Sequence, residues 1–508
     1  MNSSLKKIIL LVLAVACLAG AGVTQRALNA DRKVLGLTRG EVLDNAPPVL
    51  AFTTVALGGF RGLISNALWI RMNKLQEEDK FFEMMQLGDW ITKLEPTFVQ
   101  VWTVQAWNMA YNISVKFKDA ADRWRWVRAG IGLLRDDGLR FHPNEMLLYR
   151  ELGWFFQHKM GQNLDDANVY YKTRWALEDM AKVFGTEKPN LDELVNPQTA
   201  DARARVGVLT NTYKMDPKLM RELDQRYGPL DWRLPEAHAI YWFARGLQQA
   251  EKNPGKIKAD DLMTLRRGIY QSMALSFKRG RLVVSPYVRQ VDFRPNLAII
   301  PKVNEAYAQM MTEEPKQREH IQIAHRNFLL EAIANLRAYN RTAEATKLWD
   351  QLKRQYPNKP IFAEDTNSLP ANMTFEDYAL RPLQETVTET DRDKIIGVIE
   401  SLLDDAYLEL IKGEDEYAAG KQAFARRIHE VYMAKIGRNA NQERIGLPPL
   451  AEIDRPVREH WLNPTNGAPD EVRAILRTKL NLPAESVPPP QSTNAIPAAV
   501  GNPGTTNR

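Results

Sequence analysis

The chain has 508 residues, of which 44% are hydrophobic and 26% charged, so it can build a substantial core and is not an intrinsically disordered protein. Its 68 basic and 62 acidic side chains leave a formal net charge of only +6, which excludes the concentrated basic surface expected of a nucleic-acid-binding protein. The single cysteine, Cys17, excludes an internal disulfide and a thiolate metal cluster.

Residues 1–26 have the pattern of a bacterial export signal. Lys6 and Lys7 precede an uncharged apolar run from Ile8 to Val23. This run comes close to the minimum of about 17 residues for a membrane-spanning helix, and flanking lysine side chains can reach the membrane surface. We therefore expect a retained signal anchor. It predicts a single-pass protein of the bacterial inner membrane, with the bulk of the chain in the periplasm.

The N-terminal segment has two alternatives to a retained anchor, cleavage and lipidation. The small residues from Ala19 to Ala21 are typical of a signal-peptide cleavage site. The residues that end at Cys17 resemble a bacterial lipobox, which makes Cys17 the candidate lipidation site. Each alternative also predicts that the rest of the chain lies outside the bacterial cytoplasm.

Amphipathic helices follow a linker that spans residues 27–59. Apolar residues recur at helical spacing, and Pro96 and Pro143 close the first two pairs of helices. Three such pairs are predicted within residues 60–185. Residues 186–230 interrupt the pattern and are interpreted as an insertion with short helices, and two further pairs are predicted within residues 231–360. Between these two pairs, "LVVSPYVRQVDFRPN" predicts a short hairpin or an extended crossing segment.

The pattern changes beyond Pro360. Residues 361–482 are predicted to form a C-terminal helical region, with longer amphipathic helices near 388–411 and 416–436 and a loose region from Pro448 to Pro464. Residues 483–508 are rich in Pro, Ser, Asn and Gly. They cannot bury enough apolar surface to offset their ordering entropy, so they are predicted to be a disordered tail.

Two of the predicted pairs place large and small residues at a recurring spacing. In the fifth pair these residues are Leu329, Ala332, Ile333, Leu336, Ala345, Trp349, Leu352 and Pro357. In the third pair they are Tyr149, Leu152, Gly153, Phe156, Ala167 and Tyr171. This spacing resembles the tetratricopeptide repeat (TPR) family. The resemblance implies an all-α fold, a TPR-like α-solenoid of helical hairpins, to which the patterns described above add an N-terminal membrane helix and a helical C-terminal unit.

The same resemblance assigns a second set of residues to the concave groove in which TPR proteins bind their partners. These residues are Trp107 and Tyr111 in the second pair, Arg150, Trp154 and His158 in the third, and His238, Tyr241, Arg245 and Gln248 in the fourth. Trp, Tyr and Arg contribute large contact areas and oriented hydrogen bonds at docking surfaces. The alternative is that a neighbouring helix, or the insertion at residues 186–230, covers this face.

No catalytic or cofactor motif accompanies these residues. The sequence contains no HExxH, CxxC or CxxCH pattern, no glycine-rich phosphate loop and no GxSxG elbow. Adjacent carboxylates such as Asp165 and Asp166 are typical of turns and helix caps. We therefore expect no enzymatic activity, no metal and no cofactor.

Together these features predict a membrane-tethered periplasmic scaffold or adaptor that docks a protein of the cell envelope in its groove and binds no nucleic acid. The alternative is an envelope enzyme, carbohydrate-active or peptidoglycan-modifying, that holds sugar on Trp107 and Trp154. A ligand-binding lipoprotein is a third hypothesis.

Overall fold

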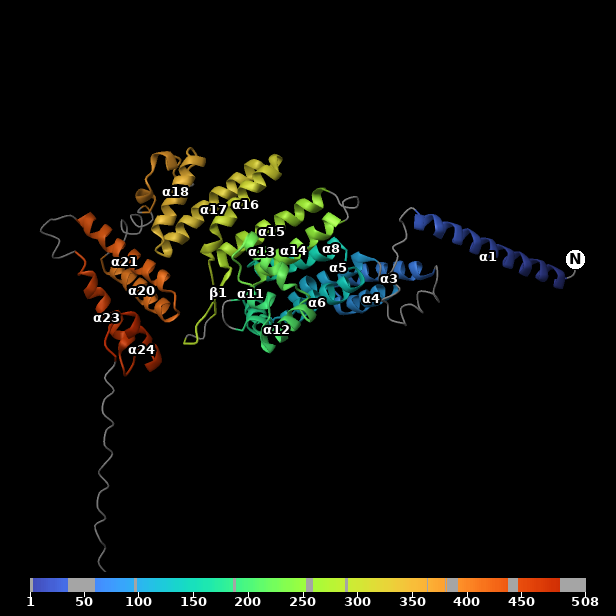
Figure 1. Ribbon diagram of the computed structural model, residues 1–508, viewed down its shortest axis with the longest axis horizontal. Coiled ribbons are helices and arrows are strands. Elements are labelled where there is room, and N and C mark those ends of the chain that lie inside the picture. Colours follow the sequence, from blue (N-terminus) through green and yellow to red (C-terminus); the bar gives the residue numbers. More distant parts are fainter. Residues whose placement is uncertain are drawn as a thin grey trace, which may run out of the picture. The chain divides into compact units, whose positions relative to one another are not determined.

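The computed structural model describes residues 3–34, 60–95, 98–185, 189–252, 259–287, 291–362, 364–379, 381, 392–436 and 446–484. The chain divides into two compact units (Figure 1). Unit 1 comprises Met1–Leu282 and Arg294–Ala306, and unit 2 comprises Val283–Phe293 and Tyr307–Arg508. The fourth and fifth predicted helical pairs, expected to form one domain within residues 231–360, therefore fall in different units.

The described residues are mostly helical, which confirms the predicted all-α class. The sheet found among them has two strands, β1 (Arg281–Val284) and β2 (Val291–Arg294), paired as a hairpin. It lies where the sequence gathers β-branched residues. Of the two predictions made for that stretch, the short hairpin is the one that the structure shows.

The N-terminal helix α1 (Ser3–Val34) continues past Arg26, where the predicted anchor ends, and Cys17 is an exposed free thiol within it. Among the residues that the structure describes, no helix combines the length and the apolar character needed to cross a membrane. The predicted location, a single-pass inner-membrane protein with its bulk in the periplasm, is therefore wrong. The uncharged run from Ile8 to Val23 is shorter than the roughly 20 residues that a spanning helix requires.

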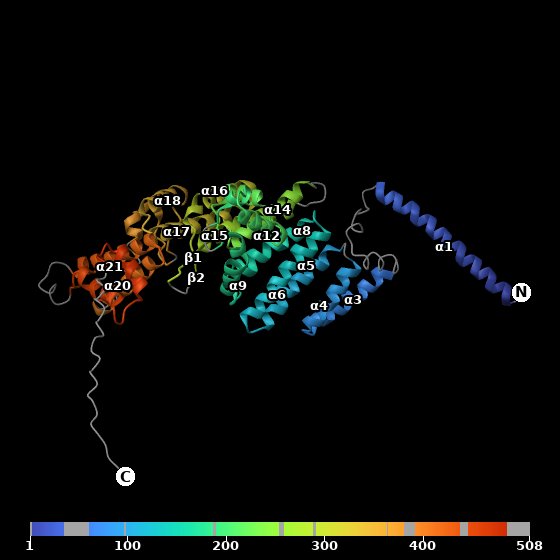
Figure 2. The same ribbon diagram turned by 60° about the horizontal axis from the view of Figure 1, so that its bottom comes forward.

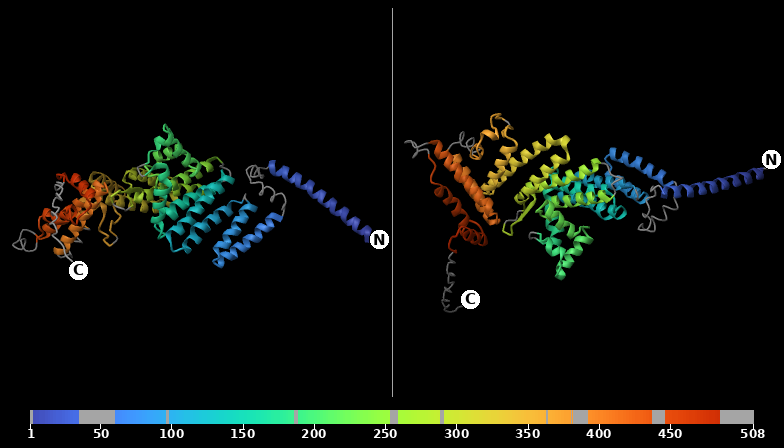
Figure 3. Two further views of the ribbon diagram at one scale, coloured as in Figure 1. Left: turned by 90° about the horizontal axis from the view of Figure 1, so that it is seen from below. Right: turned by 45° about the horizontal axis from the view of Figure 1, so that its top comes forward.

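Unit 1 contains the first four helical pairs. The first pair is α3 (Phe60–Glu77) and α4 (Phe81–Leu94). The second pair consists of α5 (Val99–Trp107), η1 (Asn108–Ile113), η2 (Ser114–Lys116), α6 (Ala120–Gly132), η3 (Leu133–Gly138) and α7 (Leu139–Phe141). The third consists of α8 (Met146–Trp154), η4 (Phe155–Gly161), α9 (Asn168–Arg174), η5 (Trp175–Met180) and α10 (Ala181–Phe184). Figures 2 and 3 show these helices side by side in chain order.

The predicted insertion contains three short helices, α11 (Leu191–Val195), α12 (Ala200–Asn211) and α13 (Pro217–Tyr227). Each begins at a capping side chain, because Asn190, Thr199 and Asp216 accept hydrogen bonds from backbone N–H groups of the first turn. The fourth pair follows as α14 (Pro235–Lys252) and α15 (Ala259–Arg279). These caps explain how helices of so few turns begin where they do.

The third and fourth pairs pack closely around one phenylalanine. A Cβ atom on Gly153 of α8 would lie 2.7 Å from the Phe243 ring, and one on Gly268 of α15 would lie equally close to it. The Phe243 ring of α14 therefore fills the space that two missing side chains leave. The predicted core residues of the third pair, among them Tyr149 and Tyr171, are buried.

Unit 2 contains the fifth pair and the C-terminal helices. Its elements are α17 (Arg318–Ala338), α18 (Thr342–Gln355), η9 (Pro370–Asn372), α20 (Arg392–Ile411), α21 (Asp415–Ile436), α23 (Leu450–Leu462) and α24 (Asp470–Lys479). Before α17 in sequence, η7 (Leu297–Ile299) belongs to unit 1, the boundary after Ala306 falls within α16 (Ile300–Glu313), and η8 (Pro315–Gln317) belongs to unit 2. The predicted packing residues of the fifth pair from Leu329 to Leu352 are buried.

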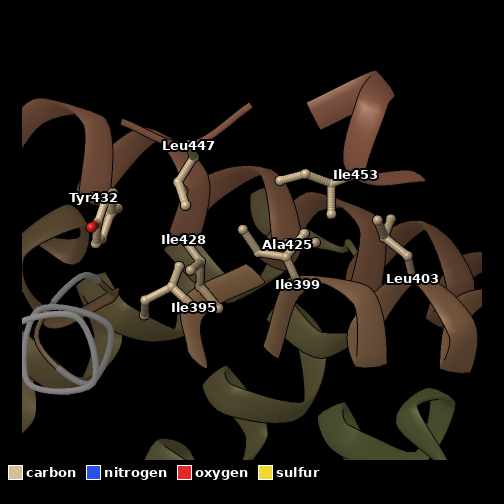
Figure 4. Close-up of a cluster of buried hydrophobic side chains, with 8 residues drawn as sticks. All are labelled: Ile395, Ile399, Leu403, Ala425, Ile428, Tyr432, Leu447 and Ile453. Carbon is tan, nitrogen blue, oxygen red and sulfur yellow. The ribbon is translucent and has the colours of Figure 1, made fainter. Parts of the chain in front are cut away.

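A second core forms where α20, α21 and α23 meet in unit 2 (Figure 4). It contains Ile395, Ile399, Leu403, Ala425, Ile428, Tyr432, Leu447 and Ile453. The sequence predicts a loose region from Pro448 to Pro464, but the structure places α23 there, with Pro456 inside the helix. Burial of Ile453 in this core offsets the backbone hydrogen bond that Pro456 removes. The predicted tail lies outside the described residues, apart from Pro483 and Ala484.

Candidate docking surface

The first helix of the second pair keeps one stripe of side chains uncovered. Val101, Trp102 and Gln105 of α5 are buried against neighbouring helices, whereas Val104 and Trp107 are 36% and 39% exposed. Val104, Trp107 and Tyr111 follow one another at intervals of three and four residues and therefore share a helix face. Tyr111 is half-buried on that face.

Four rings from the second and third pairs form a connected surface feature, here called the ring ladder: Trp107, Tyr111, His158 and Trp154. Trp107 and Tyr111 stack with ring centroids 4.0 Å apart, and Trp154 and His158 stack at 4.5 Å. The Tyr111 hydroxyl and the His158 Nδ1 lie 3.1 Å apart, which links the two stacks by a hydrogen bond. The ladder thus brings together four of the predicted groove residues.

The ladder is a repeated feature of the two pairs. Each of its stacks begins directly before a π-helical segment, because Trp107 precedes η1 and Trp154 precedes η4. The spacing of 47 residues from Trp107 to Trp154 is the same as that from Tyr111 to His158. The second helices of both pairs also contain π segments, η3 and η5. Single-turn π segments re-aim the side chains around them and are frequent at functional sites.

The ladder carries no charge at neutral pH. Burial lowers the pKa of His158, and the neighbouring Lys159 ammonium lowers it further, so the imidazole is neutral. Burial raises the pKa of the Tyr111 hydroxyl, and the Glu151 carboxylate acts in the same direction. The rings therefore present a largely apolar surface, on which the Tyr111 hydroxyl and the His158 Nδ1 satisfy each other.

The charges beneath the ladder are paired. The Lys159 Nζ lies 2.6 Å from the Asp165 Oδ2 and 5.0 Å from the centroid of the Tyr111 ring. Arg123 joins the same group, 2.9 Å from Asp165 and 2.6 Å from Asp166. These ion pairs involve Asp165 and Asp166, the adjacent carboxylates that the sequence analysis assigned to a turn or helix cap. The sequence reasoning missed Lys159, because a lysine within a helix is ordinarily a surface residue.

The cations at the edge of the ladder also have partners. Arg150 is 2.9 Å from the Glu151 Oε1 and 4.0 Å from the Asp261 Oδ1. Arg245 places its guanidinium 5.7 Å from the centroid of the Tyr149 ring and is half-buried. Both residues lie where the groove was predicted, but their charges are already compensated or covered.

The structure corrects the expectation that His238 and Tyr241 line an open groove, because both side chains are buried. The His238 Nε2 donates to the Trp232 carbonyl at 2.9 Å, and its ring stacks on Phe156 with centroids 5.2 Å apart. Burial lowers the pKa of His238 to about 3, so it is neutral. The Tyr241 hydroxyl accepts a hydrogen bond of 2.9 Å from the Asp216 backbone N–H. Asp216 belongs to the insertion, so the alternative that the insertion covers this face holds for the fourth pair.

A buried polar cluster at the junction of the third and fourth pairs has no counterpart in the sequence analysis. The Lys172 Nζ lies 3.2 Å from the Asn168 Oδ1 and 3.4 Å from the Asn163 Oδ1, and Arg279 donates to that same Asn163 oxygen. Burial lowers the pKa of Lys172 to about 8, and burial raises the pKa of the Glu236 carboxyl against the opposing effect of Lys172. Nothing in the local sequence distinguishes these residues from surface charges.

In the described part of the chain, no group of three or more His, Cys, Asp or Glu side chains is arranged to hold a metal ion. Comparison with known proteins adds no family assignment. No protein-family model, curated protein or solved structure matches the chain. The function is therefore inferred from the geometry of the ring ladder and its surroundings.

Proposed function

We propose that the chain is a docking protein, whose ring ladder binds a segment of a partner protein on the face of a TPR-like helical array. The observation that carries the proposal is the ladder itself, four stacked and hydrogen-bonded rings with Trp107 39% exposed at one end. Exposed Trp and Tyr side chains held rigidly by their neighbours are the residues that contribute most to binding at protein interfaces.

The packing order of the helices supports a repeating array. Helix α8 contacts α5 on one side and α14 on the other, so the first helices of three successive pairs are neighbours. Among the second helices, α6 contacts α9. The common spacing of 47 residues between the ladder positions of the second and third pairs is the regularity expected of a duplicated hairpin. It is longer than the roughly 34 residues of the standard TPR unit.

The binding surface in this proposal is confined to the second and third pairs. The fourth pair contributes the half-buried Arg245 but not His238 or Tyr241, which the core and the insertion enclose. Val104 and Val115, 36% and 50% exposed, extend the apolar surface along the helix that carries Trp107. The partner is thus expected to lay an extended or helical segment across two hairpins rather than along a continuous groove.

Site-directed photo-crosslinking tests the proposal. A benzophenone amino acid at Val104, next to Trp107, is expected to form a stoichiometric crosslink with one protein in an extract of the cells that express the chain. Adding Trp107→Ala should abolish this crosslink. Trp90→Ala is the matched control, because Trp90 is 54% exposed on α4 and should leave the crosslink intact. Circular dichroism confirms that each variant is folded.

Two results would contradict the proposal. One is a crosslinking pattern that Trp107→Ala leaves unchanged, which would show that the ladder is only a packing feature. The other is retention of cell-wall glycan fragments, rather than protein, in a manner that depends on Trp107 and Trp154. That result would favour the carbohydrate-active alternative, since sugars also stack on exposed tryptophan rings.

A further inference from the structure

We propose that the partner segment bound by the ring ladder is an uncharged, proline-rich stretch in the polyproline II conformation. The inference rests on the proposed function and specifies the chemistry of its partner. It uses three properties of the ladder, all of whose residues belong to unit 1: its charge, the spacing of its rings, and the hydrogen-bonding groups around them.

The ladder selects against anionic ligands. No residue from Val99 to Val115 is charged, although 26% of the chain is. At the edge of the ladder Arg150 is paired with Glu151, and beneath it Lys159 is paired with Asp165. An anionic ligand would therefore lose hydration on this surface and would have to compete with a carboxylate for either cation.

A cationic ligand is disfavoured for a separate reason. Cations bind aromatic rings through the negative potential over the ring face. The Lys159 ammonium already lies 5.0 Å from the centroid of the Tyr111 ring, so it uses this interaction and repels a second positive charge. The ladder therefore favours an uncharged occupant, and it does not form a cage for a quaternary ammonium group.

The spacing of the rings favours an occupant that lies flat on them. Trp107 and Tyr111 stack with centroids 4.0 Å apart and an angle of 17° between their planes, and Trp154 and His158 stack at 4.5 Å and 12°. Rings at these distances are in van der Waals contact, so no side chain fits between the members of a stack. A helix that anchors itself by inserting large side chains finds no slot within either stack, whereas a proline ring packs flat on an exposed indole.

The size of the ladder matches a short polyproline II segment. Successive ring centroids along Trp107, Tyr111, His158 and Trp154 are 4.0, 5.8 and 4.5 Å apart. The four rings therefore span less than two turns of polyproline II, which extend about 19 Å at three residues per turn and about 3.1 Å per residue. Prolines three residues apart share one face of this helix, so about six residues cover the ladder.

The hydrogen-bonding groups of the ladder favour proline over sugar. The Tyr111 hydroxyl and the His158 Nδ1 satisfy each other at 3.1 Å, and the neighbouring cations Arg150 and Lys159 are paired. The hydroxyl groups of a sugar would lose water on this surface and find few partners in exchange. A proline residue has no N–H donor to satisfy, and a polyproline II segment keeps its carbonyl groups solvated.

Fluorescence anisotropy of a labelled peptide tests the inference on the full chain. The probe is decaproline with blocked termini and an uncharged dye, and we expect a dissociation constant on the order of 100 µM. Trp107→Ala should weaken its binding at least about tenfold. Trp90→Ala is the matched control, because Trp90 is an exposed tryptophan on α4 outside the ladder, and should leave binding unchanged.

Three further peptides examine the chemistry of the ligand. A blocked peptide of the same length with only Gly and Ser is neutral but flexible and lacks proline rings, so it should bind at least about tenfold more weakly. Decaproline peptides with one central residue replaced by Lys or by Glu should each bind several-fold more weakly, because the ladder offers neither charge a partner.

The partner itself provides the second measurement. Mass spectrometry of the crosslink formed from Val104 should place it in a segment without charged residues and with prolines three residues apart. Unlabelled decaproline at about 1 mM should reduce the yield of this crosslink about tenfold, as expected for competition at ten times the dissociation constant.

The inference would be overturned by decaproline that does not bind at 1 mM, by binding that Trp107→Ala leaves unchanged, or by equal binding of the Gly and Ser peptide. Any of these results, found together with a partner crosslink that Trp107→Ala abolishes, would remove this inference alone and leave the proposed function standing. Absence of both the crosslink and peptide binding would remove both. Chitotetraose that binds through Trp107 where decaproline does not would assign the ladder to carbohydrate.

Discussion

The first helices of the third and fourth pairs carry the same kinds of residue at similar spacing, yet the structure treats them differently. In the third pair, Trp154 and His158 are half-buried and join the ring ladder. In the fourth pair, His238 and Tyr241 are enclosed. The two helices contact each other, so neighbouring positions in the array do not give these residues the same exposure.

The difference comes from the groups that cover each face. Tyr241 receives a hydrogen bond from Asp216 of the insertion, and His238 donates one to the Trp232 carbonyl, just before α14. In the ladder, the Tyr111 hydroxyl and the His158 Nδ1 instead satisfy each other. Polar aromatic residues therefore indicate a binding face only where no other segment has already satisfied them.

The largest loss of stability is expected where the third and fourth pairs meet. Gly153→Val places carbon atoms where the Phe243 ring lies, since even a Cβ would be 2.7 Å from that ring. Unfolding in urea, followed by circular dichroism, should show a loss of about 3 kcal/mol in the free energy of unfolding. Gly207→Val, in α12 with only one side-chain atom near its Cβ position, is the control and should change stability by less than about 0.5 kcal/mol. Equal effects at both positions would contradict the close packing described.

The two histidines should differ in their dependence on pH. The folded-state pKa of His238, about 3, is below the unfolded value of about 6.5, so the fold prefers the neutral ring and loses stability as pH falls through this window. Between pH 7 and pH 5 this single group should lower the free energy of unfolding by about 2 kcal/mol. The measurement is the difference between wild type and His238→Phe in urea at the two pH values.

His158→Phe is the matched comparison for that experiment. Burial lowers the pKa of the His158 imidazole as well. This ring is only half-buried, however, and keeps part of its contact with solvent. Its contribution to the change between pH 7 and pH 5 should be clearly smaller than that of His238. A larger contribution from His158 would show that the ladder, and not the fourth pair, is the sealed site.

The two tyrosines should separate stability from binding. Tyr241→Phe leaves the Asp216 N–H without its acceptor and should cost about 1 kcal/mol of stability without changing the yield of the partner crosslink from Val104. Tyr111→Phe breaks the link to His158 at a partly solvated site and should cost less stability but lower the yield of that crosslink several-fold. Urea titration and crosslink yield, measured on the same preparations, provide the two readouts. If both variants changed stability and binding to the same extent, the faces of Tyr241 and Tyr111 would not differ as described.

The smallest effect is expected at the edge of the ladder. Arg150 pairs with Glu151 and retains 30% of its side-chain exposure, and such ion pairs contribute about 0.5 kcal/mol or less. Arg150→Ala should therefore change stability by no more than that amount and the yield of the partner crosslink from Val104 by less than about twofold. A tenfold loss of crosslink yield would show that charge recognition, rather than ring stacking, dominates the surface.

Much of the helical framework could be predicted from residues close together in sequence. The apolar faces of the third and fifth pairs, the insertion and its short helices, and the helices near 388–411 and 416–436 all follow patterns with the period of a helix. The sequence also placed the small residue Gly153 at a packing position, where the structure brings the Phe243 ring into the space that its missing side chain leaves. The location was predicted wrongly, since the uncharged run in α1 is too short for a span.

The sequence by itself determined that the protein is helical, where most of its helical pairs lie and which faces of the third and fifth pairs are buried, because helix periodicity is a local property. Only the tertiary structure decided which aromatic residues stay accessible. Tyr241 is closed by Asp216, 25 residues away, and the ladder joins Tyr111 to His158 across 47 residues. Such contacts depend on how separate segments come together in space, and no pattern within a single helix encodes them.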